Sequence, residues 1–171
     1  MKVFITGASS GIGEALAREY RRRHPQAALG LVARRADALH ALAHALDGDR
    51  TLALPADVAD RGAMQRAADA YVQRFGVPDV VIANAGISAG TVTGAPGDAE
   101  VFERIVRTNV IALFDTFAPF VPGMRAAGGG CLVGIASVAG VRGLPGAGKS
   151  TRLNSSHTWI SYAGFCLKKK T

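Results

Sequence analysis

The sequence has 171 residues, of which 49% are hydrophobic and 19% charged, as is typical of one globular domain. No apolar run approaches the roughly 18 residues of a membrane-spanning helix, and a strand-like segment at Lys2 leaves no room for a signal peptide. We therefore expect a cytoplasmic protein that does not bind membranes. Two cysteines, Cys131 and Cys166, are too few for a disulfide framework, and no metal site is predicted.

The net charge of +7 is unevenly distributed along the chain. Residues 149–171 carry five of the 20 basic residues and none of the 13 acidic ones, so the rest of the chain has a net charge of only +2. This small excess does not indicate nucleic-acid binding, and the basic run at residues 21–23 is interpreted as the end of a helix. Lys2 is the only lysine before Lys149, which indicates a change of composition there.

Short β-branched runs alternate with helical patterns, which predicts βαβ units on a parallel sheet. The expected strands are Lys2–Thr6, Leu29–Ala33, Thr51–Leu54, Val80–Ala83 and Cys131–Ala136. The expected helices are Gly11–Arg23, Asp37–Leu46, Asp60–Phe75 and Asp98–Met124. Ser10 is expected to cap the first helix, and Pro119 and Pro122 are expected to break the last one.

A glycine-rich turn, Thr6-Gly7-Ala8-Ser9-Ser10-Gly11-Ile12-Gly13, joins the first strand to the first helix. Its glycines allow a sharp turn and the close approach of a pyrophosphate, whose charge would meet N–H groups at the helix N-terminus. A lone glycine turn could equally serve strand–helix packing. The candidate cofactor-binding residues here are Gly7, Ser9, Ser10, Gly11, Ile12 and Gly13.

This turn resembles the Thr-Gly-x-x-x-Gly-x-Gly fingerprint of the short-chain dehydrogenase/reductase (SDR) family, and four more family motifs follow in order. They are Ala56-Asp57-Val58, Ala83-Asn84-Ala85-Gly86, Thr108-Asn109-Val110 and Ile135-Ala136-Ser137. Ala83 departs from the family, which has asparagine there. Singly, such an Asp, Asn or Ser would be interpreted as a helix cap or a surface residue, but five ordered motifs favour the family.

The resemblance implies a role for each of these motifs. Asp57 and Val58 would hold the adenine ring, and Asn84, Ala85 and Gly86 would contact the cofactor. Asn109 and Ser137 would be catalytic: Asn109 anchors a water in the proton relay, and Ser137 holds the substrate oxygen.

The resemblance also implies an α/β fold, a doubly wound parallel sheet of the Rossmann type in the order 3-2-1-4-5, truncated after the fifth strand. The parent protein would be an oxidoreductase that interconverts a small-molecule alcohol and a carbonyl by hydride transfer, as a homodimer or homotetramer.

The cofactor is predicted from the charge at the end of the second strand. NAD sites place a carboxylate there to bind the ribose hydroxyls, whereas NADP sites need a cation for the 2′-phosphate. Arg34 and Arg35 follow this strand and are the candidate phosphate ligands, so NADP is favoured over NAD. Asp37 lies past the strand end and is interpreted as a helix cap. The alternative is that one or both arginines are only solvated surface charges.

The family's Tyr-x-x-x-Lys acid/base pair is missing from the sequence. Ser150 and Asn154 stand where it should follow Ser137, and Tyr162 is followed four residues later by Cys166. A serine hydroxyl is too weak an acid to replace a tyrosine. We therefore expect this chain to be inactive.

The composition changes where that motif should begin. Residues 149–171 resemble the conceptual translation of a common short-read sequencing adapter, ending in a lysine run that resembles trailing adenines. We expect residues 1–148 to be an incomplete NAD(P)-binding Rossmann domain and residues 149–171 to be a non-native tail, the alternative being a natural divergent C-terminus. A truncated sheet would leave the fifth strand as an exposed edge and uncover apolar surface, giving poor solubility.

Two other functions are compatible with parts of the sequence. Residues Gly143–Ser150 spell a formal G-x-x-x-x-G-K-S phosphate loop of an NTPase, but they do not directly follow a strand, and too few residues follow for a magnesium-binding strand. A non-catalytic fragment that binds a dinucleotide is the second alternative.

Overall fold

The computed structural model describes residues 1–89 and 96–137, together with the backbone of residues 165–168. The strands are β1 (Lys2–Thr6), β2 (Ala28–Ala33), β3 (Thr51–Pro55), β4 (Val80–Ala83), β5 (Gly129–Gly134) and β6 (Phe165–Lys168). The helices are α1 (Gly11–Arg23), α2 (Ala36–Ala45), α3 (Arg61–Phe75), α4 (Asp98–Val106), the π-helical turn η1 (Arg107–Ile111), α5 (Ala112–Phe117) and α6 (Val121–Ala126).

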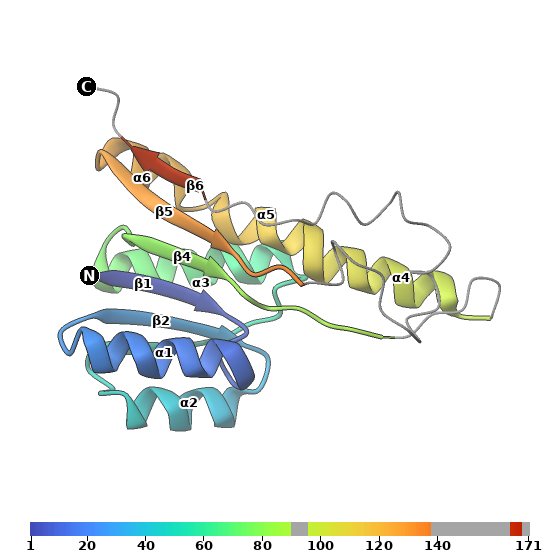
Figure 1. Ribbon diagram of the computed structural model, residues 1–171, viewed down its shortest axis with the longest axis horizontal. Coiled ribbons are helices and arrows are strands. Elements are labelled where there is room, and N and C mark those ends of the chain that lie inside the picture. The colour runs from blue at the N-terminus through green and yellow to red at the C-terminus, as the bar shows by residue number, and fades with distance from the viewer. Residues whose placement is uncertain (90–95, 138–164, 169–171) are drawn as a thin grey trace.

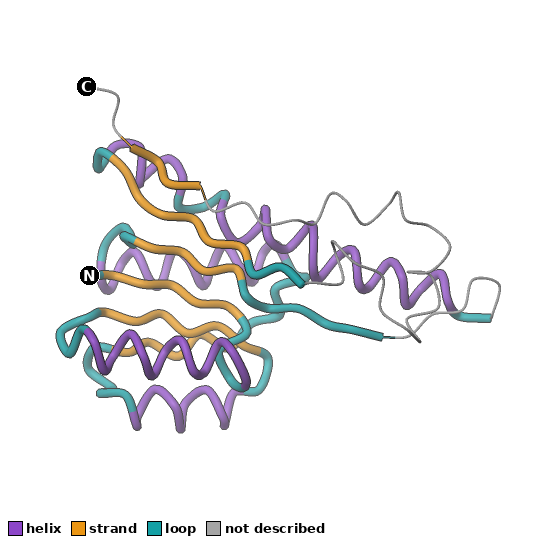
Figure 2. The backbone as a smooth tube through the Cα atoms, viewed as in Figure 1, coloured by secondary structure: helices purple, strands orange, loops and turns teal. Residues whose placement is uncertain are grey.

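The strands form one sheet in the order β3-β2-β1-β4-β5-β6 (Figures 1 and 2). All pairings among β1 to β5 are parallel, which confirms the predicted order 3-2-1-4-5. The expectation that β5 is an exposed edge is wrong for this structure, because β6 pairs with it antiparallel along Gly129–Leu132. An unpaired strand edge is a template for another strand, and here β6 covers the edge of β5 over these four residues.

Helices cover the two faces of the sheet in separate groups. Side chains alternate between faces along β1: Val3 and Ile5 belong to the apolar cluster beneath α1 and α2, and Phe4 to the cluster beneath α3, α5 and α6. Figure 1 shows α1 and α2 on the near face and α3 on the far face. The burial of β1 and β2 on both faces explains their nearly continuous apolar sequences.

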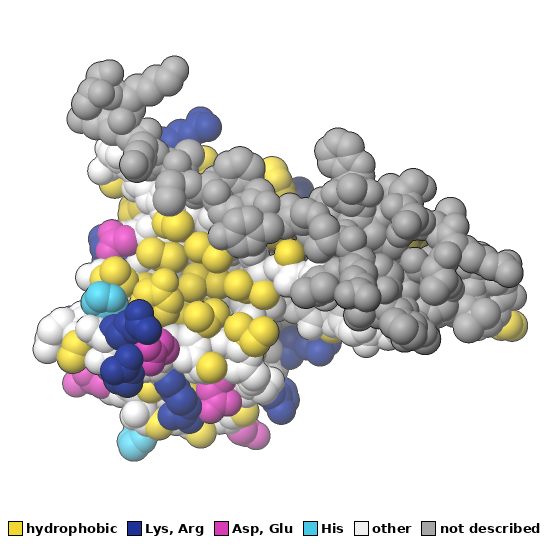
Figure 3. All heavy atoms as spheres, in the orientation of Figure 1, with side chains coloured by type: hydrophobic (Ala, Val, Ile, Leu, Met, Phe, Trp, Pro, Cys, Tyr) yellow, Lys and Arg dark blue, Asp and Glu magenta, His cyan; other side chains and the backbone are white. Residues whose placement is uncertain are grey.

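On the near face, no described helix lies over β4 and β5. Figure 3 shows hydrophobic side chains gathered over the middle of this face. Tyr20 of α1, Val80 of β4 and Val133 of β5 are only partly buried against the cluster there. Apolar side chains are therefore partly exposed on this face, and the predicted poor solubility stays a prediction.

The long helical stretch predicted for residues 98–124 is divided into four segments. The π-helical turn η1 separates α4 from α5, and a turn at Pro119 separates α5 from α6. The break near the prolines was expected, but the π-helical turn was not. None of the helices formed by the described residues is long and apolar enough to cross a membrane.

Helix caps follow the sequence only in part. Ser10 is the N-cap residue of α1, but its side chain makes no capping hydrogen bond, so the predicted side-chain cap is wrong. Asp60 does cap α3, accepting a hydrogen bond from the N–H of Ala63 at 3.0 Å. This bond favours the charged carboxylate and lowers the pKa of Asp60.

Gly30 of β2 provides a test of core packing. A Cβ atom placed on Gly30 would lie 2.3 Å from Cδ2 of the buried ring of Tyr71, and overpacking of this kind costs about 1–3 kcal/mol. We expect Gly30→Ala to lower the free energy of unfolding by about this amount in urea denaturation. Gly48→Ala is the control, since no heavy atom lies within 4 Å of a Cβ there; equal stability losses in both variants would contradict the prediction.

Candidate functional site

The predicted site residues gather at one edge of the sheet because the carboxyl ends of parallel strands all point the same way. The glycine-rich turn leaves β1 at this edge. Gly7 and Gly11 have φ angles of 67° and 58°, in the left-handed region that favours glycine. Glycine therefore occupies the two positions of the turn at which the backbone adopts a left-handed conformation.

The turn after β1 packs directly against the end of β4. Thr6 Oγ1 accepts hydrogen bonds from the main-chain N–H groups of Asn84 and Ala85, both at 3.1 Å. The Asn84 side chain donates in return to the Thr6 carbonyl oxygen at 3.0 Å. A Cβ on Gly13 would lie 2.3 Å from the Gly7 oxygen, so only glycine permits α1 to start this close. Thr6 was not among the predicted site residues.

The N-terminus of α1 opens toward the same edge. Because the Ser10 side chain caps nothing, it leaves the first-turn N–H groups unsatisfied, and such groups favour an anion. Ile12 is 61% exposed, so its side chain does not join the core. The uncapped helix end and the bare glycine turn fit a pyrophosphate.

The two arginines after β2 reach the neighbouring loops. Arg35 donates to the Ser9 carbonyl oxygen at 3.0 Å and to Ser9 Oγ at 3.3 Å, joining the end of β2 to the glycine-rich turn. Arg34 lies 3.9 Å from Asp57 Oδ2, an exposed pair across the ends of β2 and β3. Both guanidinium groups therefore lie beside the predicted site.

Asp57 and Val58 play different parts after β3. Asp57 Oδ1 accepts a hydrogen bond from the N–H of Ala59 at 2.9 Å, which closes a short turn. The Val58 side chain is only 6% exposed and belongs to the core cluster. Any contact of Val58 with a ligand must therefore come from its main chain.

Asn109 lies at the centre of the π-helical turn η1. Its side-chain amide makes two hydrogen bonds with Ile87, just beyond Gly86: Oδ1 accepts from the Ile87 N–H and Nδ2 donates to the Ile87 carbonyl, both at 2.9 Å. The side chain is thus committed to fixing the loop after β4. Its main-chain carbonyl is another group that could anchor a water. Turns of this kind occur frequently at functional sites.

Ser137 lies at the same edge, exposed, three residues after β5 ends. The N–H of Ile135 donates to the Ala83 carbonyl at 3.0 Å, which carries the β4–β5 pairing to the start of this segment. The residues that replace the family's acid/base pair, Ser150 and Asn154, lie outside the described residues, as do Tyr162 and the phosphate-loop motif Gly143–Ser150.

Neither described tyrosine is placed to act as the acid. The Tyr71 hydroxyl is buried and donates to the Ala28 carbonyl at 3.3 Å, and burial raises its pKa. Tyr20 lies on α1 beneath the partly covered face, where burial also raises its pKa.

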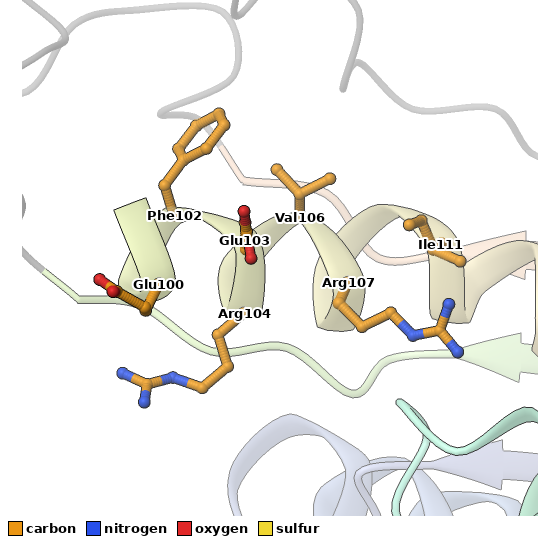
Figure 4. A pocket seen from close by; sticks show the side chains of 7 residues that line it. All are labelled: Glu100, Phe102, Glu103, Arg104, Val106, Arg107 and Ile111. Atoms are coloured by element: carbon orange, nitrogen blue, oxygen red, sulfur yellow. The ribbon is translucent and has the colours of Figure 1, made fainter. Parts of the chain in front are cut away.

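Two other surface features carry none of the predicted site residues. A shallow hollow follows α4 and η1, and Figure 4 shows Phe102 and Val106 on one side of the helix and Arg104 and Arg107 on another. At the far end of α1, Arg22 and Arg23 pair with Glu19 and hold its pKa near 2, as expected of a helix-end cluster.

Known proteins resemble this chain over most of its length. The family described as short chain dehydrogenase matches residues 1–149. The chain is 35% identical over 145 residues to 2-(R)-hydroxypropyl-CoM dehydrogenase of Xanthobacter autotrophicus, covering 83% of this chain and 58% of that protein. It is 38% identical over 146 residues to glycine betaine reductase ATRR of Emericella nidulans, covering 84% of this chain but 11% of the relative.

A solved structure shares the fold. The alcohol dehydrogenase of the archaeon Thermococcus sibiricus, complexed with 5-hydroxy-NADP, superposes with a TM-score of 0.79 at 30% identity. The match covers 93% of this chain and 66% of that one. The chain thus spans less than two thirds of the two curated relatives and of this structure.

The hydrogen bonds of Thr6 provide a test of the site. In Thr6→Val the N–H groups of Asn84 and Ala85 lose their acceptor, and an unsatisfied buried donor costs about 1–3 kcal/mol. We expect lower stability in urea denaturation and faster hydrogen exchange at both amides. Thr6→Ser keeps the hydroxyl and should keep the slow exchange; equally fast exchange in both variants would mean that the hydroxyl does not fix the end of β4.

Proposed function

Because this chain belongs to the short-chain dehydrogenase family, we propose that it is the cofactor-binding portion of an NADP-dependent oxidoreductase that interconverts an alcohol and a carbonyl. The observation that carries the proposal is the packing of the glycine-rich turn against the end of β4, with the start of α1 uncapped beside it. Glycines and uncapped helix N–H groups of this kind would accommodate a pyrophosphate.

Each part of the cofactor has residues suited to hold it. The glycine-rich turn, Gly7 to Gly13, would hold the pyrophosphate through main-chain N–H groups. Asp57 would accept from the adenine amino group, with the Val58 main chain beside it. Asn84, Ala85 and Gly86 would contact the nicotinamide half, because they follow β4 at the centre of the sheet.

NADP is proposed over NAD because Arg34 and Arg35 are both exposed at the end of β2. Arg35 already contacts Ser9 of the glycine-rich turn, so its guanidinium lies beside the turn that would hold the cofactor. No acidic residue follows β2 directly, since Asp37 stands beyond both arginines within α2. Guanidinium groups bind phosphate through paired hydrogen bonds.

The chemistry of the parent enzyme would depend on few side chains. The bound nicotinamide supplies or accepts the hydride. Ser137, exposed at the carboxyl edge, would hold the substrate oxygen through its hydroxyl, and the main-chain carbonyl of Asn109 would hold a water in the proton relay. A proton donor for the substrate oxygen would have to be a tyrosine activated by a lysine, and the sequence lacks this pair after Ser137.

We therefore propose that residues 1–148 are an incomplete Rossmann domain and that residues 149–171 are foreign to it. The parent protein would act on a small molecule as a homodimer or homotetramer. The second candidate function, a dinucleotide-binding fragment without catalysis, is favoured for this chain by the missing acid/base pair.

The cofactor preference is tested by removing one guanidinium. We expect Arg35→Ser to raise the Kd for NADPH at least about tenfold by loss of a charged hydrogen bond, and to change the Kd for NADH less than about twofold. Cofactor fluorescence measures both. Arg18→Ser is the matched control, because Arg18 bonds Glu14 on the outer side of α1. Equal losses for NADH and NADPH would argue against a 2′-phosphate contact.

The missing acid/base pair is tested by turnover. We expect the chain to bind NADPH but to leave it unoxidised with a panel of aldehydes and ketones, as followed by the absorbance of the reduced nicotinamide. Turnover above the rate without protein would contradict the predicted inactivity. Absence of NADPH binding would contradict both the enzyme and the binding-fragment functions.

A further inference from the structure

A buried carboxylate lies behind the site, on α5. Asp115 is 3% exposed and accepts a hydrogen bond from Arg61 Nε at 2.8 Å through Oδ1. Its Oδ2 is buried, accepts no hydrogen bond from the described residues, and lies 3.9 Å from a terminal nitrogen of Arg107. A buried carboxylate with one oxygen that accepts no hydrogen bond lowers the free energy of unfolding compared with an apolar side chain. Packing alone therefore does not explain why an aspartate occupies this position.

Arg107 connects this carboxylate to both ends of the proposed site. Its Nε donates to the Ala59 carbonyl at 2.9 Å, and the Ala59 N–H donates to Asp57 Oδ1. Arg107 is also the first residue of the π-helical turn whose centre, Asn109, holds Ile87. Arg107 therefore links the turn that contains Asp57, the proposed adenine ligand, to the π-helical turn that contains Asn109.

We propose that Arg107, oriented by Asp115, is a positioning residue that holds the Asp57–Ala59 turn against the π-helical turn, and so fixes the adenine end and the catalytic end of the site relative to each other. The proposal rests on the function given above for Asp57 and Asn109. Arg107 touches no reacting group. It acts because a planar guanidinium can donate to the Ala59 carbonyl through Nε while a terminal nitrogen faces Asp115, which a lysine ammonium cannot do at once.

Arg61 provides a matched control because it donates to the same carboxylate, whereas the hydrogen bond to the Ala59 carbonyl comes from Arg107. Both Arg61→Met and Arg107→Met remove a cation from Asp115, so both are expected to lower global stability. Only Arg107→Met removes the donor to the turn. A purely structural role would affect the two variants alike.

The test is amide hydrogen exchange of the full chain, with the Leu31 amide of the buried β2 reporting global unfolding. Relative to Leu31, we expect the Ala59 and Ile87 amides to exchange about tenfold faster in Arg107→Met, the effect of losing one charge-assisted hydrogen bond. In Arg61→Met the same ratios should stay within about twofold of the unchanged chain. Ratios that are unchanged in Arg107→Met, or raised equally in both variants, overturn the proposal.

Binding of adenosine 2′,5′-bisphosphate, followed by calorimetry, gives an independent measure. Where the unchanged chain binds it, Arg107→Met should raise the Kd about tenfold and Arg61→Met less than about twofold; an unchanged Kd in Arg107→Met overturns the proposal. If the unchanged chain does not bind the bisphosphate but the exchange ratios behave as expected, the proposed cofactor function fails, while the link between the two turns is supported.

Discussion

The contact between the end of β1 and the end of β4 is the constraint on which the site depends. One hydroxyl, Thr6 Oγ1, accepts from two consecutive N–H groups of the β4 loop, and the Asn84 side chain returns a hydrogen bond to β1. The start of α1 can then approach only because Gly13 lacks a side chain. The turn, the loop and the helix end are therefore fixed together, and each would lose its geometry if one of the others moved.

Most of the fold could be predicted from the sequence because it depends on local patterns. The apolar runs of β1 and β2 are recognised within a few neighbouring residues. The strand order came from a family resemblance carried by five separate motifs. The π-helical turn could not be predicted, since residues 107–111 differ little in helix propensity from their neighbours, and the long-range bonds from Asn109 to Ile87 give no signal in sequence spacing.

The site was predicted as residue types but not as contacts. The sequence indicates Arg34, Arg35 and Asp57 as separate candidates, whereas the structure pairs Arg34 with Asp57 and Arg35 with Ser9. For Val58, the position in the motif predicts a contact with the ligand, but the structure places its side chain in the core. Thr6 and Arg107 were missed because their importance arises from partners 78 and 48 residues away.

The π-helical turn also sets the rotational phase of the helix that enters it. An α-helix advances about 100° per residue around its axis, and a π-turn contains one residue more than an α-turn. The side chains of α4 are therefore rotated about the helix axis by roughly 100°, compared with a continuous α-helix running from α4 into α5. Phe102 of α4 and Phe114 of α5, both more than half exposed, owe their relative orientation to this extra residue. The extra residue of η1 therefore affects both the position of Asn109 in the site and the directions in which the exposed side chains of α4 and α5 point. A change that removed it would alter the outer surface of these helices and the interior of the site together.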